Sequence, residues 1–496
     1  MQGRSANRET GTERIDRREL LRRGAALGAA LAVHPWTRAA RAQAAPRVVI
    51  VGAGLAGLSA AYRLWRDDGI AAEVYEAQDR VGGRVLTHRV FGNAVAEGGG
   101  QTINSNEATI RSLVSELGLS LVDLDRVWPT GRIVYQLNGR ERRWGAFGGA
   151  LREAERVAYR HYRSIDWPVT HDSAGAEAAR WDRVTAADWI DRYCPGGLRG
   201  LAGEYLRVLF EVDYAGPVTG MSAIHVIAEL GGTFWGGGYD ERYTIRGGND
   251  RLPSALEAAL PPGAVRRGQH LVAVSRDGSG RPRCSLSTGA AVADVVADAV
   301  ILALPFAVLR QLDTANAGFS EVKRAAIERL GAGINRKLHL EFDREPWRPA
   351  TGETWTDLRI GTTWPEDPGQ QNAPPLLVSM TGTRHPRLGS APAHGPAPRP
   401  AVLDALAPLD RIFPGARRAY AERSYLDDWP ADPWARGSYS YYLAGDFTSF
   451  AGAEGQPEGP FHFAGEHTAP YPKRGTMNGA IESGFRAADE VIASSG

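Results

Sequence analysis

The chain of 496 residues lacks the residue sets on which several common kinds of functional site depend. Cys194 and Cys284 are its only cysteines, which is too few for a disulfide framework or a cysteine-based metal site. Whether these two form a single bridge stays open. No catalytic triad, metal-ligand cluster or pair of catalytic carboxylates stands out in the sequence. We therefore predict no metal site.

Long apolar runs are also missing, and positive charge is concentrated at one end. After the first 45 residues no apolar run reaches the roughly 18 residues that a transmembrane helix needs, so we expect no membrane span in the mature chain. Residues 1–42 carry nine arginines and four acidic residues, so their removal takes the net charge from +1 to −4. No basic patch then remains to suggest nucleic acid as a partner.

The first 45 residues have the composition of a targeting segment. The pair Arg17-Arg18 precedes an apolar run over 24–33, which is too short to span a bilayer. Ala40 and Ala42, on either side of Arg41, offer the small residues of a cleavage site. The segment resembles a twin-arginine export signal, which implies a periplasmic or secreted protein. A disordered basic N-terminus is the alternative.

A glycine-rich turn follows a short apolar strand and is the first motif with chemical meaning. Residues 48–51 read Val-Val-Ile-Val, which is typical of a buried parallel strand. In a dinucleotide-binding turn of this spacing, the first glycine permits the turn and the second lets the backbone approach a pyrophosphate. The third glycine lets the next helix, expected over 58–66, pack on the strand. The residues expected to bind the cofactor here are Gly52, Gly54, Ala56 and Gly57.

A carboxylate and a cation follow this turn. A strand predicted over 72–75 ends at Glu76, close to the spacing of about 20 residues that places a carboxylate on a ribose hydroxyl. Ala77 comes next, and the pair Gly83-Arg84 suits a second phosphate contact because the guanidinium can neutralise charge that the helix end does not.

These segments resemble the opening of the flavin-dependent amine oxidase superfamily, which includes monoamine, polyamine and L-amino-acid oxidases and histone lysine demethylases. The resemblance implies FAD and an α/β protein, in which a Rossmann-like FAD-binding domain is interleaved with an α+β substrate domain. Two domains also suit the length, since single cores rarely exceed about 250–300 residues. The expected segments are a signal peptide at 1–45, FAD-binding parts at 46–106, 243–330 and 425–496, and substrate-domain parts at 107–242 and 331–424.

The same resemblance gives cofactor-binding roles to residues further along the chain. A glycine-rich stretch at 96–102 corresponds to a family segment beside the flavin ring. The run 463–468, Phe-Ala-Gly-Glu-His-Thr, closely matches polyamine oxidases and demethylases, and the helix that starts near 477 is expected to face the flavin. The residues expected at the cofactor are Gly99, Gly100, Gln101, Leu271, Trp434, Gly465, Glu466, Thr476 and Met477.

Three residues are candidates for the chemistry: Lys337, Tyr439 and Thr476. Lys337 lies in an alternating strand pattern over 334–342, where a lysine ordinarily faces solvent. Family members carry a lysine ten residues before a tryptophan, as Lys337 and Trp347 do, and that lysine holds a water near flavin N5. An apolar site would lower the pKa of such a lysine. Tyr439 matches one wall of the family's aromatic cage, whereas Thr476 stands where monoamine oxidases have the second cage tyrosine.

The resemblance also implies a reaction. An amine is oxidised to an imine, which hydrolyses to an aldehyde or ketone, and O2 reoxidises the flavin to give hydrogen peroxide. Some members attach FAD through a cysteine where this chain has Ser438, so we expect non-covalent FAD. A small-molecule amine is the expected substrate. The oligomeric state stays open, with a homodimer as one option.

Four alternatives remain at this point. They are a desaturase or protoporphyrinogen-type oxidase, an amine dehydrogenase that uses a cytochrome, an L-amino-acid oxidase and a non-catalytic flavoprotein. Amino-acid oxidases place an arginine in the glycine-rich segment to hold the substrate carboxylate, where this chain has Gln101. Arg246 or Arg336 would have to supply that cation instead.

Periodicity predicts the coarse structure between the motifs. The stretch 107–242 reads as mostly helical, and Trp235, between glycines, is a candidate pocket residue. Further strands are expected over 271–274, 292–303 and 376–381, further helices over 253–260 and 401–413, and a loop over 390–400.

Overall fold

The computed structural model describes these residues of the chain: 46–129, 131–233, 240–366, 370, 372–383, 392–471 and 473–495. The expected export signal, residues 1–45, and Trp235 lie outside the described residues. Within them, no helix is both long enough and apolar enough to cross a bilayer.

Strands from distant parts of the chain form a five-stranded parallel sheet. Its order is β22 (Phe461–Phe463), β13 (Ala299–Leu302), β1 (Val48–Val51), β2 (Glu73–Tyr75) and β9 (Val265–Arg266). All four residues of β1 are buried, as its unbroken apolar run predicts for a strand that is covered on both faces. The predicted Rossmann-like α/β architecture is therefore confirmed.

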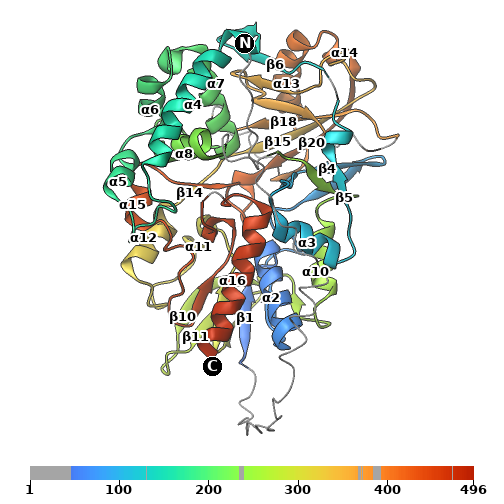
Figure 1. Ribbon diagram of the computed structural model, residues 1–496. Coiled ribbons are helices and arrows are strands. Elements are labelled where there is room, and N and C mark those ends of the chain that lie inside the picture. The colour runs from blue at the N-terminus through green and yellow to red at the C-terminus, as the bar shows by residue number, and fades with distance from the viewer. Residues whose placement is uncertain are drawn as a thin grey trace, which may run out of the picture. The chain divides into compact units, whose positions relative to one another are not determined.

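Two long helices from opposite ends of the chain lie side by side against this sheet (Figure 1). They are α2 (Leu55–Asp68) and α16 (Met477–Ser495). α2 begins three residues earlier than predicted. A Cβ on Gly484 of α16 would lie only 2.2 Å from the Ala56 carbonyl oxygen, so glycine at this position permits the close approach of the two helices.

A second sheet has eight strands and lies above the five-stranded parallel sheet in Figure 1. Its order is β19 (His394–Pro396), β20 (Tyr420–Asp428), β15 (Arg336–Phe342), β18 (Leu376–Thr381), β17 (Thr362–Pro365), β16 (Thr354–Thr356), β6 (Val134–Leu137) and β7 (Arg140–Arg142). β15 lies between β18 and β20, and all seven of its residues are buried. Lys337 therefore faces the interior, although its strand pattern alone indicated solvent.

Smaller strands complete the sheets and hairpins. They are β3 (Thr87–Phe91), β4 (Ala94–Glu97), β5 (Leu121–Asp123), β8 (Tyr243–Ile245), β10 (His270–Arg276), β11 (Pro282–Ser287), β12 (Val292–Val296), β14 (Gly331–Ala332) and β21 (Ser440–Tyr441). The single strand expected over 292–303 is wrong in one respect. It divides into β12 and β13, which belong to different sheets, because the chain turns between Val296 and Ala299.

The region 107–242 contains the helices that its periodicity predicts, together with three strands that were not predicted, β5, β6 and β7. The helices between α2 and α16 are α3 (Ala108–Glu116), α4 (Gly148–Arg163), α5 (Ala176–Asp182), α6 (Ala186–Tyr193), α7 (Leu201–Leu209), α8 (Ala223–Ala228), α10 (Arg251–Ala258), α11 (Phe306–Leu309), α12 (Glu321–Arg329), α13 (Arg399–Ile412), α14 (Ala416–Ala419) and α15 (Asp446–Phe450).

The loop expected over 390–400 is corrected over its described part. Residues 394–396 form the edge strand β19, and α13 already begins at Arg399. Proline and glycine composition indicated a loop, but pairing of β19 with the distant β20 provides its backbone partners.

Candidate functional site

A large cavity opens where the parallel strands end. It has a volume of about 1390 Å³, part of it open to solvent, and residues at the carboxyl ends of β1, β2 and β13 and just after β22 line it. Ligands of open α/β sheets bind at this edge. Its lining runs from the glycine turn after β1 to residues of β15 and of the segment before α16, which suits an extended cofactor together with a substrate.

The glycine turn brings a helix N-terminus to this cavity. Gly52 has φ of 103°, and a Cβ there would meet the Ala303 carbonyl oxygen at 2.7 Å. α2 begins directly after Gly54, and no side chain caps it. Its first N–H groups are therefore available to an anion, and the helix dipole favours negative charge there. Gly54 and Ala56 line the cavity, whereas Gly57 lies behind it and acts in packing.

Glu76 is placed at the end of β2 as predicted, with Ala77 beside it in the cavity wall. Its carboxylate oxygens accept hydrogen bonds from Ala53 N at 2.7 Å and Gln78 N at 2.9 Å. Burial raises the pKa of this carboxyl, and the two N–H donors oppose that rise. Because each carboxylate oxygen has a second lone pair, Glu76 retains acceptors for a ribose hydroxyl.

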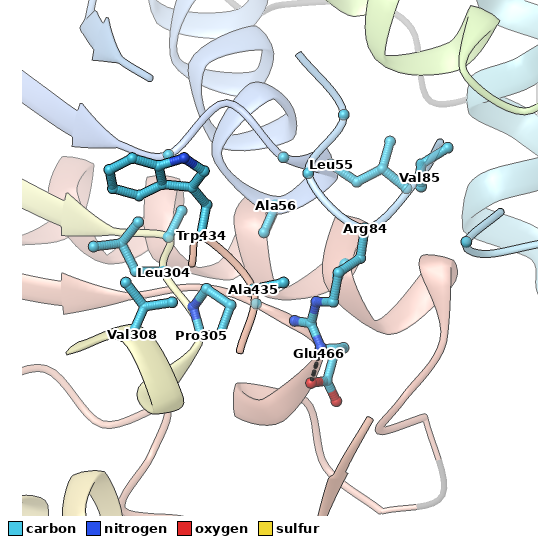
Figure 2. A pocket seen from close by; sticks show the side chains of 18 of the residues that line it. Leu55, Ala56, Arg84, Val85, Leu304, Pro305, Val308, Trp434, Ala435 and Glu466 are labelled. Carbon is cyan, nitrogen blue, oxygen red and sulfur yellow. Dashed lines mark hydrogen bonds and ion pairs between the residues drawn. The ribbon is translucent and has the colours of Figure 1, made fainter. Parts of the chain in front are cut away.

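Arg84 and Glu466 form an ion pair across the cavity wall, as Figure 2 shows. Arg84 Nη1 lies 2.8 Å from Glu466 Oε1, and the same nitrogen donates to the Ser438 carbonyl oxygen. The other Glu466 oxygen accepts from Ser440 Oγ at 2.8 Å and from Gly475 N at 2.9 Å. Burial alone would raise the pKa of Glu466, but Arg84 and neighbouring cations hold it below its usual value. These two predicted cofactor residues thus bind each other, and Glu466 fixes the entry to α16.

Lys337 reaches the cavity from β15 and is held by three acceptors of the glycine-rich stretch. Its Nζ donates to Glu97 O at 3.0 Å, Gly99 O at 2.9 Å and Gln101 Oε1 at 2.9 Å. An ammonium has three hydrogens, so these bonds use all of them. Burial lowers the pKa of Lys337, and nearby carboxylates oppose that effect. Gln101 therefore acts on Lys337 from outside the cavity lining, whereas Gly99 lines it.

Close packing explains the glycines of this stretch. A Cβ on Gly99 would lie 1.9 Å from the Arg84 carbonyl oxygen, and one on Gly100 would lie 2.9 Å from Met477 Cγ. Gly100 and Met477 both line the cavity. The stretch is thus clamped between the Arg84 loop and the start of α16, and only glycine fits there.

The remaining predicted residues also lie at the cavity. Leu271, Trp434, Tyr439, Gly465 and Thr476 all line it. Burial raises the pKa of Tyr439, with Asp213 and Glu241 adding to that rise, so the phenol is neutral beside two acidic residues. The Thr476 hydroxyl donates to Lys473 O at 3.0 Å and accepts from Gly479 N at 2.9 Å, which is the bonding of a helix cap and not of a cage wall.

Sequence reasoning missed several residues. Asn335, Met380 and Asp432 line the cavity, but they belong to no motif. Asp213 and Glu241 were missed because they lie in a π-helical turn and a loop without a characteristic spacing. Burial raises the pKa of both carboxyls, and that signal exists only in the folded chain.

The donor set fits FAD. An uncapped helix N-terminus, a buried carboxylate at the end of the second strand and glycines without room for a Cβ surround one elongated cavity. Neither cysteine lines it, and both are buried and free.

Comparison with known proteins agrees with this geometry. The family model for flavin containing amine oxidoreductase matches residues 55–492. Polyamine oxidase 1 of Oryza sativa subsp. japonica is 30% identical over 519 residues, covering 90% of this chain and 97% of the relative. L-amino acid dehydrogenase of Synechocystis sp. is 25% identical, covering 90% and 94%.

Solved structures share the fold at lower identity. Wild-type putrescine oxidase bound to putrescine aligns with a TM-score of 0.76 at 22% identity, covering 90% of this chain and 99% of that one. Cyclohexylamine oxidase from Brevibacterium oxydans IH-35A aligns with a TM-score of 0.77 at 19% identity, with the same coverage.

Proposed function

Because the chain belongs to the flavin-containing amine oxidoreductase family, we propose that it oxidises a small-molecule amine to an imine with non-covalently bound FAD. The imine then hydrolyses to an aldehyde or ketone. The observation that carries this proposal is a single cavity that joins the nucleotide motifs at Gly52 and Glu76 to Lys337 and Tyr439. The bound FAD would supply an acceptor for the two electrons of the amine α-carbon–hydrogen bond, and O2 would take these electrons up as hydrogen peroxide.

The protein's own groups hold and orient the reactants. The α2 N-terminus offers N–H donors to a pyrophosphate, Arg84 lines the cavity while paired with Glu466, and Glu76 offers acceptors to a ribose. At the other end, Tyr439 presents an aromatic face, and Asp213 and Glu241 lie close enough to raise its pKa. An aromatic face of this kind favours an amine or ammonium group of the substrate.

Non-covalent attachment is supported by the placement of the thiols. Ser438 lines the cavity where a cysteine would be needed, and its hydroxyl donates to Asn335 Oδ1. Burial raises the pKa of Cys194 to about 11 and that of Cys284 to about 12, so both thiols are held in the unreactive protonated form.

The geometry gives no support to an amino-acid substrate. Arg336 is buried and paired with Asp428 at 2.8 Å, and Arg246 is exposed. Neither lines the cavity, so neither is placed to hold a substrate carboxylate there. We further propose that the protein is exported, on the basis of the paired arginines and apolar run near its N-terminus.

The test is anaerobic mixing of the flavin-loaded enzyme with putrescine, spermidine, cyclohexylamine, benzylamine and a set of L-amino acids. We expect at least one amine to bleach the visible flavin absorbance, and admission of air to restore it with formation of one peroxide per cycle. Bleaching by amino acids alone would contradict the substrate class. Bleaching by dithionite but by no amine would contradict the whole proposal. Reoxidation of the reduced flavin by a cytochrome but not by air would show that a cytochrome, and not O2, is the electron acceptor.

Lys337→Met should slow reduction or reoxidation many-fold while FAD stays bound. Lys473→Met is the matched control, because Lys473 is a half-exposed lysine paired with Glu482 at 2.6 Å. Equal kinetics in the two variants would remove Lys337 from the mechanism.

A further inference from the structure

Beside Lys337 and outside the cavity lining lies a group of buried and partly buried titratable side chains that belong to no sequence motif. We name it the Asp427 cluster: His88, His339, His394, Glu366 and Asp427. The side chains of His339, Glu366 and Asp427 are 0% exposed. None of the five lines the cavity. Burying so many charges is expensive unless they compensate one another, so their arrangement calls for a function.

Glu366 connects this cluster to the segment that holds Lys337. Its Oε1 accepts from Glu97 N at 2.8 Å and from Gln101 Nε2 at 3.2 Å. Those same two residues give Lys337 two of its three acceptors, the Glu97 carbonyl and the Gln101 amide oxygen. The Glu366 carboxylate therefore binds N–H donors of the segment from Glu97 to Gln101, and the Lys337 ammonium binds oxygen acceptors of the same segment.

His339 connects Glu366 to Asp427. It lies two residues after Lys337 on β15, on the same face of the strand. Its Nδ1 lies 3.5 Å from Glu366 Oε2, and its Nε2 lies 3.3 Å from Asp427 Oδ2, which are ion-pair distances. Burial lowers its affinity for a proton, but the two carboxylates outweigh burial and raise the pKa of His339 to about 9. The two carboxyl groups therefore favour the protonated form of the ring.

We infer that His339 and Glu366 are positioning residues, which form a buried charge pair behind the cavity wall and set how tightly Lys337 holds its proton. The pair acts through charge: the Glu366 carboxylate favours the ammonium, and the His339 imidazolium partly cancels that carboxylate. This inference rests on the proposed function in one respect, which is the role of Lys337 in flavin reduction or reoxidation.

Other charged groups around Lys337 do not duplicate this arrangement. Glu97 and Glu241 favour the ammonium only when they are ionised, and burial raises the pKa of both carboxyls, that of Glu97 to about 8, which weakens their effect at neutral pH. Asp427 is paired opposite Lys337 on β20, but three histidines surround it. On the other side of β15, β18 places Met380 opposite Lys337 and Val378 opposite His339, and neither is charged.

The neighbours on β15 have partners of their own. Arg336 pairs with Asp428 and Glu341 pairs with Arg423. The cluster is closed on its remaining side by His394, whose Nδ1 lies 2.7 Å from Asp427 Oδ1 and whose Nε2 lies 3.2 Å from Asp432. Glu366 therefore has two relevant properties. Its charge is partly balanced by His339, and its hydrogen bonds connect it to Lys337 through Glu97 and Gln101.

The two positioning residues predict opposite effects. In His339→Asn the Glu366 carboxylate loses its neighbouring cation, so Lys337 should hold its proton to higher pH. In Glu366→Gln one of the carboxylates that favour the ammonium is removed, so Lys337 should release its proton at lower pH. Each shift should be about one pH unit or more, which is the usual effect of adding or removing a charge at close range.

The composition of the chain makes this directly measurable. Its only lysines are Lys323, Lys337 and Lys473. In flavin-loaded enzyme labelled with ¹³C at lysine Cε, the pH titration of Lys337 can be followed as one of three signals and assigned by its loss in Lys337→Met. No amine substrate is needed, so failure of the proposed amine oxidation leaves this result readable.

His88→Asn is the matched control. His88 is also buried and also contacts Asp427, at 2.9 Å, but no contact joins it to Glu366 among the described residues. We expect it to leave the Lys337 midpoint in place. Opposite shifts in His339→Asn and Glu366→Gln support the inference. An unmoved Lys337 midpoint in both, or an equal shift in His88→Asn, overturns it. If His339→Asn does not fold, Glu366→Gln decides alone by the sign of its shift.

A second readout follows reoxidation by O2 of enzyme that dithionite has reduced, across pH 6 to 10. Its pH midpoint should move with the Lys337 midpoint in each variant. Shifted NMR midpoints with an unchanged rate profile would leave the charge pair in place and remove Lys337 from the reoxidation step of the proposed function.

Discussion

Replacing Gly57 with alanine tests how the glycine turn, α2 and β1 meet. A Cβ at this position would lie 1.9 Å from the Gly52 carbonyl oxygen and 3.2 Å from Ala303 Cβ. A carbon and an oxygen that are not bonded require more than 3 Å, so the first turn of α2 has to move by about 1 Å or more. Overpacking of this kind typically costs about 1–3 kcal/mol.

The size of the chain decides which assay shows this effect. Unfolding entropy is about 2 cal/mol/K per residue, so for 496 residues 1 kcal/mol moves Tm by only about 1 °C. FAD affinity is the sensitive measurement, because the displaced turn carries the N–H groups that face the phosphate. Loss of about 1.4 kcal/mol there weakens binding about tenfold. We therefore expect Gly57→Ala to lower Tm by a few degrees at most and FAD affinity by about tenfold or more, measured by flavin titration of apoprotein.

Gly69→Ala is the matched control at the other end of the same helix. Gly69 has φ of 66°, and nothing lies within 4 Å of the position that a Cβ would occupy. It should lose about 1 kcal/mol of stability through backbone strain and keep its FAD affinity. Equal FAD affinity in Gly57→Ala and wild type would show that the turn does not need this close contact. The packing role assigned to Gly57, the third glycine of the turn, would then be wrong.

Other predictions concern attachment, pH and export. Acid precipitation of the purified enzyme should release all the flavin into the supernatant, and yellow colour retained in the pellet would contradict non-covalent binding. Stability in urea should fall as pH rises from about 6.5 to 9, because carboxylates outweigh burial and raise the pKa of both His339 and His394 to about 9 from an unfolded value near 6.5. This stabilisation is complete below pH 6.5 and is lost as the folded histidines release their protons, so Asp427→Asn should flatten the decline, and an unchanged slope would argue against these assignments. Arg17→Lys with Arg18→Lys should keep the protein in the cytoplasm, as fractionation would show, and continued export would defeat the signal assignment.

Local chemistry explains what the sequence could predict. Gly52, Gly54 and Glu76 lie within one strand–helix–strand unit, where turn geometry and spacing constrain each residue type. The same holds for β18, whose predicted bounds agree with the structure. Such features depend on neighbours within about 30 residues, so a single sequence contains the information that they need.

Features that depend on distant pairing were not predictable in the same way. Arg84 and Glu466 are separated by 382 positions, and nothing in either motif indicates that they bind each other. The alternation around Lys337 predicted a strand, but its buried, central place in the eight-stranded sheet depends on β18 and β20, which pair with its two edges from later in the chain. His339 was part of that alternation and carried no signal of its own, because its partners Glu366 and Asp427 lie on other segments.

The distribution of charge in the cavity follows from these two kinds of feature and determines how reactants can be oriented. The predictable part offers the uncapped N-terminus of α2 to an anion, and Arg84 lines the cavity while it is paired with Glu466. The part that only folding assembles has an aromatic face at Tyr439, near Asp213 and Glu241, whose carboxyl pKa values burial raises. Lys337 lines the same cavity, so the charge that it carries acts on any ligand there. Control of that charge by residues outside the cavity would let the reaction be adjusted without altering either part of the cavity.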